Sequence, residues 1–145
     1  MTEEMWEQSS EGLEALQEVR ERRGFTLPLH EVMASVDPEI LRRYNALAAH
    51  LIFGPEPRAL DLKTRFLVLV GITAAVKVDT EGVEWSSQRA MEHGATEKEV
   101  LEAILLSSLP AGMPAAERAV TSLIKMRSGE GLVKQDPTTR ASDAV

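Results

Sequence analysis

The segment at residues 62–76, LKTRFLVLVGITAAV, restricts the possible fold more than any other part of the chain. Asp61 provides a helix N-cap before it and Lys77 a cation after it, so the segment is expected to be a helix. After its first turn this helix is apolar on nearly every side. It must therefore be covered by the rest of its own domain or by other subunits.

The other segments also predict helices, because apolar residues recur at helical spacing and no stretch alternates long enough to indicate a strand. We expect an all-α fold, a compact bundle of about six helices. Each helix should turn one apolar stripe inward. The predicted inward stripes are Leu13, Leu16 and Val19; Leu41, Tyr44, Leu47 (or Ala48) and Leu51; Val100, Leu101, Ile104 and Leu105; and Val120, Leu123 and Ile124.

Residues with strong positional preferences mark the expected helix ends. A short helix is also expected near residues 27–35, and a helix that starts at residue 79 or 80 should end before Gly94. The remaining signals are Gly24 as the stop of a first helix at about 8–23, Asp37 and Pro38 as the start of a helix to Phe53, Thr96 with Glu99 as a capping box, Pro110 as a stop, and a last helix at about 114–126.

A chain of 145 residues with 43% hydrophobic content can build one ordinary core. We expect an N-terminal helical arm at residues 1–36, a helical domain at 37–128, and a polar tail at 129–145 that is predicted to be disordered.

Charge and cysteine content exclude several kinds of function. The net charge is −7 and no basic stripe is present, so nucleic acid is not an expected partner. The chain has no cysteine, which rules out disulfides, thiolate metal sites and peroxidatic thiols. The N-terminal residues MTEEMWEQ do not resemble a leader, and the longest apolar run, residues 66–76, is too short to cross a membrane. The expected location is the cytoplasm.

Two residues are candidates for proton transfer. Glu84 lies in the first turns of the helix that starts near residue 80, where the helix dipole alone could explain a carboxylate. If Trp85 and its neighbours bury Glu84, burial would raise its pKa into the range useful for catalysis. His50, within ALAAHLIFG, could act as a general acid or base if it lines a cavity, or else be a hydrogen-bonded structural histidine.

Three further residues are candidates for substrate binding. Arg65 could hold a carboxylate through two contacts, or pair with an acidic residue of a neighbouring helix. Ser86 and His93 share a helix face, although Ser86 has no acid or histidine one turn before it and could simply allow close packing. The three histidines of the chain form no i,i+4 pair and have no cysteine near them, so we expect no metal and no cofactor.

Three segments, ALDLKTRFLVLVGITAAV, GVEWSSQRAMEHGATEKEVLEAI and AGMPAAERAV, resemble the carboxymuconolactone decarboxylase and alkylhydroperoxidase D-like superfamily, over about residues 37–125. The resemblance implies an all-helical fold and a homotrimer or homohexamer, whose subunits would cover the apolar helix. It also implies a redox relay of two cysteines, a histidine and a glutamate. The corresponding positions here are Asp79, Gly82, Ser86 and Phe66, and the decarboxylase branch would place its histidine at Ser86.

Two functions remain open from the sequence. The first is a cofactor-independent acid–base lyase, decarboxylase or isomerase acting on a small carboxylate or lactone, with Arg65 binding the acid and Glu84 or His50 moving a proton. The alternative is a non-catalytic oligomeric binding or scaffold protein that has lost the redox site. The leftover ionisable groups near one region favour the lyase, whereas the missing relay favours the alternative. A thiol peroxidase is excluded because the chain has no cysteine.

Overall fold

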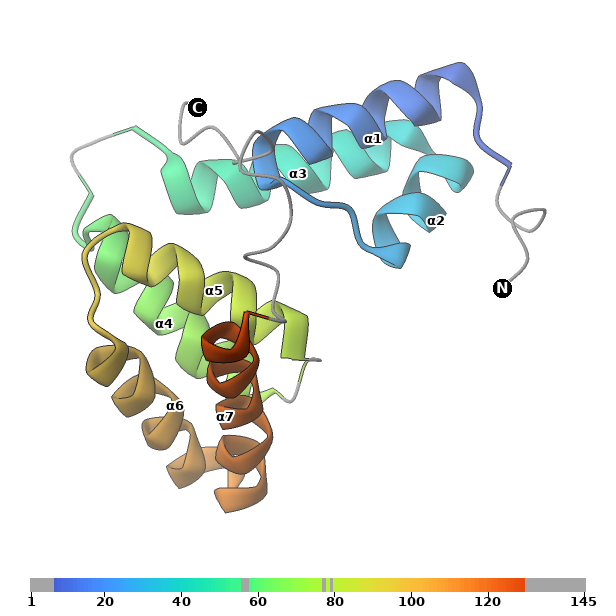
Figure 1. Cartoon of the computed structure of the whole chain (residues 1–145). Coiled ribbons are helices and arrows are strands. Elements are labelled where there is room, and N and C mark those ends of the chain that lie inside the picture. The colour runs from blue at the N-terminus through green and yellow to red at the C-terminus, as the bar shows by residue number, and fades with distance from the viewer. Residues whose placement is uncertain (1–6, 56–57, 77, 79, 130–145) are drawn as a thin grey trace. The chain divides into compact units, whose positions relative to one another are not determined.

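The computed structural model describes residues 7–55, 58–76, 78 and 80–129. These residues form helices and no strand, which confirms the predicted all-α fold, with seven helices where about six were expected (Figure 1). The helices are α1 (Ser10–Arg23), α2 (Pro28–Val36), α3 (Pro38–Phe53), α4 (Leu62–Ala75), α5 (Thr80–Glu92), α6 (Glu97–Ala111) and α7 (Met113–Ser128).

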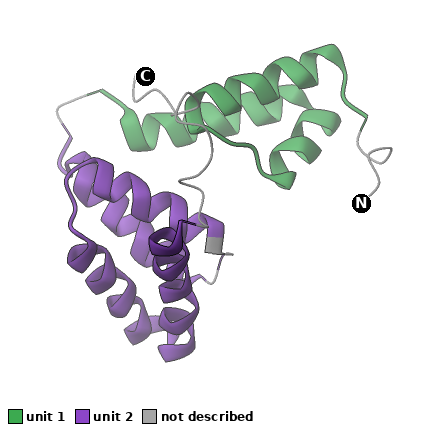
Figure 2. Cartoon of the chain, in the orientation of Figure 1, with its two compact units in different colours: residues 1–56, 135–145 green, residues 57–134 purple. Residues whose placement is uncertain are grey.

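The chain divides into two compact units (Figure 2). The first contains residues 1–56 and 135–145 and includes α1, α2 and α3. The second contains residues 57–134 and includes α4 to α7. The boundary predicted between residues 36 and 37 falls inside the first unit, between α2 and α3. The predicted disordered tail lies, apart from Gly129, outside the described residues.

Most helix ends lie where the sequence predicted them, because their signals act within one turn. Gly24 ends α1 in the left-handed conformation, with φ of 84°. Thr96 and Glu99 form the predicted capping box, in which the Thr96 N–H donates to Glu99 Oε2 at 2.7 Å and the Glu99 N–H to Thr96 Oγ1 at 3.2 Å. Asp37 and Asp61 are also N-caps, as predicted.

The predicted stop at Pro110 is wrong by one residue, since α6 continues to Ala111. A proline removes the donor for the carbonyl four residues earlier, but it does not force a helix to end before it. The helix ends instead at Gly112, whose φ of 86° is in the left-handed region and whose N–H donates to Ser108 O.

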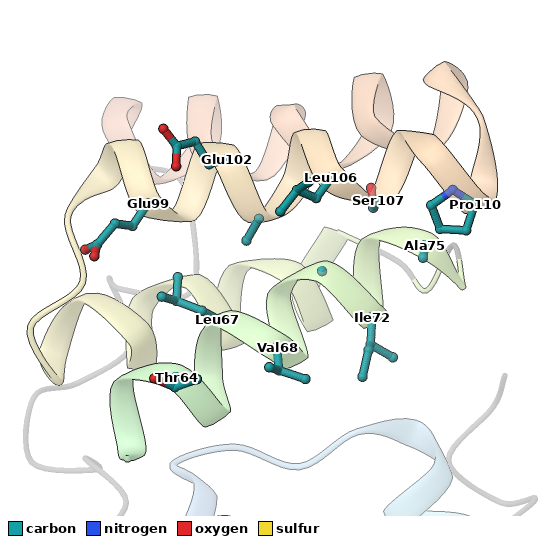
Figure 3. A pocket seen from close by; sticks show the side chains of 12 residues that line it. Thr64, Leu67, Val68, Ile72, Ala75, Glu99, Glu102, Leu106, Ser107 and Pro110 are labelled. Carbon is teal, nitrogen blue, oxygen red and sulfur yellow. The ribbon is translucent and has the colours of Figure 1, made fainter. Parts of the chain in front are cut away.

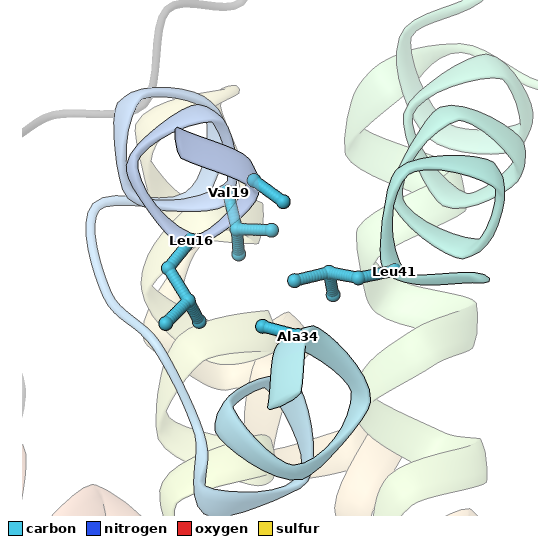
Figure 4. Packing of buried hydrophobic residues seen from close by; sticks show 5 residues of the cluster. Leu16, Val19, Ala34 and Leu41 are labelled. Atoms are coloured by element: carbon cyan, nitrogen blue, oxygen red, sulfur yellow. The ribbon is translucent and has the colours of Figure 1, made fainter. Parts of the chain in front are cut away.

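In the first unit, one small apolar cluster joins the three helices (Figure 4). The predicted stripes are partly wrong here: Leu16, Val19 and Leu41 are buried, but other members are exposed. Leu41 and Asn45, four residues apart, form the buried face of α3. Leu13 of α1 is exposed, and so are Tyr44, Leu47 and Leu51 of α3, because α1 and α2 cover only one narrow face of α3.

In the second unit, α4 packs against α5, α6 and α7. Its buried residues are Arg65, Phe66, Val70 and Ala74, so the chain itself encloses one side of α4, and the cover predicted for its other sides stays a prediction. The later stripes are again partly wrong. Val100, Ile104 and Leu123 are buried and Val120 is half-buried, whereas Leu101, Leu105 and Ile124 are exposed, as are Val68 and Ile72 of α4.

Arg118 of α7 fixes the C-terminal end of α4. Its guanidinium donates to the carbonyl of Ala74 (Nη2 to O, 3.3 Å) and to that of Val78, just beyond the helix. The last carbonyls of a helix have no partner within it, so a cation from another helix both satisfies them and interacts favourably with the helix dipole.

Replacing Arg118 with methionine is expected to lower the free energy of unfolding by about 1.5 kcal/mol, because carbonyls lose a charged donor. The measurement is urea unfolding followed by circular dichroism. Arg127→Met is the matched control, since Arg127 forms an exposed ion pair with Glu97 (2.6 Å) and should cost less than about 1 kcal/mol. Equal losses of unfolding free energy in the two variants would show that the Arg118 contacts with α4 stabilise the protein no more than an exposed ion pair does.

Candidate functional site

Helix α5 carries several polar side chains that are buried. Glu84 exposes 3% of its surface, and Ser86, Ser87 and Arg89 are buried as well. Burial of polar groups is costly unless they find partners, so a helix of this kind is where functional groups are expected. The chain folds in this way because α5 packs against α4 on one side and α7 on another.

Glu84 faces a lysine from the last helix. Its Oε1 lies 3.7 Å from Nζ of Lys125, whose side chain is 41% exposed. The ammonium therefore lies at the border with solvent while the carboxylate lies inside. Such a pair holds Glu84 in place and gives its charge a partner, as buried charges require. Chemically, the pair could also accept or deliver a proton at the carboxylate.

Phe66 lies at the centre of a small ring cluster that includes His93 and Trp85. The ring of Phe66, which is fully buried, stacks on the His93 imidazole with 5.4 Å between ring centroids and 9° between planes. Phe66 also meets Trp85 edge to face, with 5.6 Å between centroids and 75° between planes. One face of the His93 ring is thus covered by an apolar side chain. Phe66 of α4 thus contacts Trp85 within α5 and His93 just after its end.

The Ser86 hydroxyl is bonded within its own helix. Its Oγ donates to the carbonyl of Gly82 at 2.9 Å, and the residue is almost completely buried. A serine in this state donates its hydroxyl hydrogen bond to a backbone carbonyl of the preceding turn, the common arrangement of a serine inside a helix. The roles considered for Ser86, substrate binding or close helix packing, both stay predictions.

The two remaining predicted residues lie on other helices. Arg65 is buried on α4, in the second unit with Glu84, Ser86 and His93. His50 is exposed on α3, in the first unit. The second unit therefore contains four of the five predicted residues. The catalytic and binding roles assigned to all five stay predictions.

Two polar residues near Glu84 were missed from the sequence. Lys125 lies far from Glu84 along the chain, and a lysine in the last turn of a helix is already explained by the dipole, so no local signal pairs them. Ser87 is fully buried, and within the described part of the chain its hydroxyl has no hydrogen-bond partner. Its sequence gives no signal that separates it from its neighbour Ser86, which is the same residue type.

A separate groove runs between α4 and α6, with a volume of about 510 Å³ (Figure 3). The two helices run parallel along it, with Thr64 and Glu99 at one end and Ala75 and Pro110 at the other. None of the five predicted site residues lines it. Its lining is mostly apolar and consists of Thr64, Leu67, Val68, Gly71, Ile72, Ala75, Glu99, Glu102, Ala103, Leu106, Ser107 and Pro110.

The charged groups of this groove lie at its N-terminal end. Glu99 Oε1 pairs with Lys63 Nζ at 3.1 Å. The backbone N–H of Thr96, followed by Lys63, lowers the pKa of the Glu99 carboxyl below its ordinary value, so Glu99 is ionised at neutral pH. Glu102 adds a second carboxylate at this end.

In the described ranges, no three His, Cys, Asp or Glu side chains come together in a way that could hold a metal ion. No helix among the same residues is long and apolar enough to span a membrane. A family model described as the carboxymuconolactone decarboxylase family matches residues 38–124. No curated protein and no solved structure matches the chain significantly.

Proposed function

Because the chain belongs to the carboxymuconolactone decarboxylase family, we propose that it is a non-catalytic, homo-oligomeric member, a binding or scaffold protein in the cytoplasm. The observation that carries this proposal is the position of Phe66. The resemblance expects a relay glutamate there, and instead a fully buried aromatic ring stacks on His93 and meets Trp85.

Two of the other three relay positions, Gly82 and Ser86, support the same proposal, and the third, Asp79, lies outside the described residues. Gly82 has no side chain, and the Ser86 hydroxyl donates to the Gly82 carbonyl. A proton relay needs groups that exchange protons near neutral pH and reach a substrate. Glycine, phenylalanine and a backbone-bonded serine do not meet this requirement. The helical shell of the family is therefore kept without the family's reactive groups.

A second candidate, the acid–base lyase, decarboxylase or isomerase, is favoured by the Glu84–Lys125 pair. A carboxylate with 3% exposure, 3.7 Å from a half-exposed ammonium, is a plausible starting point for proton transfer. In this version Glu84 moves the proton, Arg65 binds a small carboxylate or lactone, and no cofactor takes part. His50, Ser86 and His93 would have secondary roles.

One set of measurements separates the two candidates. The wild-type protein is mixed with a panel of small carboxylates and lactones, and CO₂ release and loss of substrate are followed. If the protein is non-catalytic, no turnover above that of a heat-denatured sample is expected. If it is a lyase, we expect turnover that falls at least about 100-fold in Glu84→Gln. Glu81→Gln, an exposed glutamate of the same helix, is the matched control and should leave any activity unchanged.

Turnover that depends on Glu84 and not on Glu81 would replace the first proposal with the second. Glu84→Gln must also be shown to fold, because loss of the carboxylate leaves Lys125 without this partner. Equal helix content by circular dichroism, with Lys125→Met as a companion variant, meets this requirement.

A further inference from the structure

A small hollow lies between α6 and α7, which pack against each other. Its volume is about 310 Å³, within the range of about 300–1,000 Å³ that small-molecule sites have. It shares no lining residue with the α4–α6 groove, and neither Glu84 nor Lys125 lines it. We call it the α6–α7 hollow.

Most of the lining of the α6–α7 hollow is apolar. Leu101 of α6 and Val120, Leu123 and Ile124 of α7 form this part. Leu123 is 7% exposed, whereas Leu101 is 36% and Ile124 61% exposed. The hollow therefore has a buried floor and apolar walls in contact with water. A ligand with an apolar body would remove these walls from water, which favours its binding.

The charged lining residues gather where α6 begins and α7 ends. Arg127 Nε lies 2.6 Å from Glu97 Oε1, and Arg127 Nη2 donates to Glu97 Oε2 at 3.0 Å. This two-point pair balances one charge with the other. Lys98 also lines the hollow, and among the described residues no carboxylate pairs with it. Two cations and one carboxylate leave the hollow with a net charge of +1, in a chain whose net charge is −7.

We propose that the α6–α7 hollow binds a small molecule that has an apolar body and a carboxylate at one end. The body would lie against Leu123 and Ile124, and the carboxylate would lie near Lys98. Because Lys98 is in the first turn of α6, the positive end of the helix dipole attracts the same carboxylate. A cationic ligand would be repelled by both.

This inference rests on the binding part of the proposed function and names the site and the ligand class. It differs from the lyase candidate, in which Arg65 binds the carboxylate and Glu84 moves a proton. In the α6–α7 hollow the ligand is held without reacting, since the lining contains apolar side chains and one Arg–Glu pair beside Lys98.

The ligand class is tested with octanoate and octylammonium, which share an apolar chain and differ in the sign of their charge. Isothermal titration calorimetry of the full chain, with probe up to about 1 mM, measures both dissociation constants. We expect octanoate to bind at least about threefold more tightly than octylammonium. Unspecific binding would give the opposite order, because the chain as a whole carries a net charge of −7.

Three variants test the position of the site. Lys98→Glu should weaken octanoate binding at least about threefold, and Glu97→Gln should tighten it by about as much, because it removes the carboxylate from the charged end. A gain in affinity cannot result from loss of folding. Ile124→Glu should weaken octanoate binding at least about tenfold, since it places a carboxylate against the apolar body of the ligand.

Two controls match the charge changes outside the hollow. Glu117→Gln removes an exposed carboxylate of α7, as Glu97→Gln does from α6. Val36→Glu adds a carboxylate at an exposed apolar position of α2, as Ile124→Glu does on α7. Neither residue lines the hollow, so both variants should bind octanoate as wild type does. Circular dichroism checks that all variants fold.

Equal or tighter binding of octylammonium, or no binding of octanoate, would overturn the ligand class. Octanoate binding that is unchanged in Ile124→Glu, or equally weakened in Val36→Glu, would overturn the site. Each of these results leaves the non-catalytic proposal standing as a scaffold protein. Turnover that depends on Glu84 would instead remove the non-catalytic proposal, whatever binds in the α6–α7 hollow.

Discussion

Replacing Phe66 with alanine is expected to lower the free energy of unfolding of the second unit by about 3–5 kcal/mol. The ring is fully buried and contacts the rings of His93 and Trp85, so the substitution removes apolar contact and leaves a cavity that rigid helices cannot close. Urea unfolding followed by tryptophan fluorescence measures this loss, because Trp85 lies against the substituted ring.

Two further variants test whether loss of the buried ring causes the loss of stability. Phe66→Leu keeps most of the apolar volume and should cost less than about 2 kcal/mol. Val68→Ala removes an apolar group from an exposed position of the same helix and should cost less than about 1 kcal/mol in the monomer. If Phe66→Ala lowers the free energy of unfolding by less than about 1 kcal/mol, the Phe66 ring is not tightly packed in the folded unit. The main support for the non-catalytic proposal would then be lost.

The first unit is expected to lose about 2.5 kcal/mol of stability between pH 7.5 and 4.5 through His30 alone. His30 is buried, and its Nδ1 accepts a hydrogen bond from the Leu27 N–H at 3.1 Å. Burial, followed by the positive charge of Arg23, lowers the pKa of His30 from 6.5 to about 4. Protonation at Nδ1 would also break the bond from Leu27.

The direction of the effect follows from proton binding. Between pH 6.5 and 4 the unfolded chain binds a proton at His30 and the folded unit does not, so acid favours unfolding. The contribution is complete above about pH 6.5 and is lost as the pH falls through 4.

The matched variants are His30→Asn and His50→Asn. Asparagine at position 30 does not titrate, and its side-chain oxygen can still accept the Leu27 N–H, so the difference in stability between wild type and variant should change with pH. His50 is exposed on α3, and His50→Asn is the control for removing a histidine elsewhere in the same unit. Parallel pH curves for wild type and His30→Asn would show that His30 titrates normally in the folded unit.

The apolar helix at residues 62–76 connects the fold with the proposed assembly. Its sequence required cover on nearly every side, and the chain itself covers the side that carries Phe66, Val70 and Ala74. The side that carries Val68 and Ile72 remains exposed within the chain. The proposed homo-oligomer would cover this side.

Only part of the candidate site could be predicted from the sequence. Gly82 and Ser86 were placed on one helix face by their spacing, and their hydrogen bond follows from that spacing. The burial of Glu84 was stated as a condition, because it depends on which way α5 faces. Its partner Lys125 comes from another helix, and no local pattern connects them.

The sequence by itself determined the helical class and nearly all helix ends, because caps such as Asp61 or Thr96 with Glu99 act on backbone groups within three residues. Tertiary structure alone decided which stripe of each helix is buried, as Leu41 and Tyr44 of α3 illustrate. Where a helix offers apolar residues on more than one side, its burial depends on neighbours distant in sequence. The same dependence created the Glu84–Lys125 pair and the α4–α6 groove.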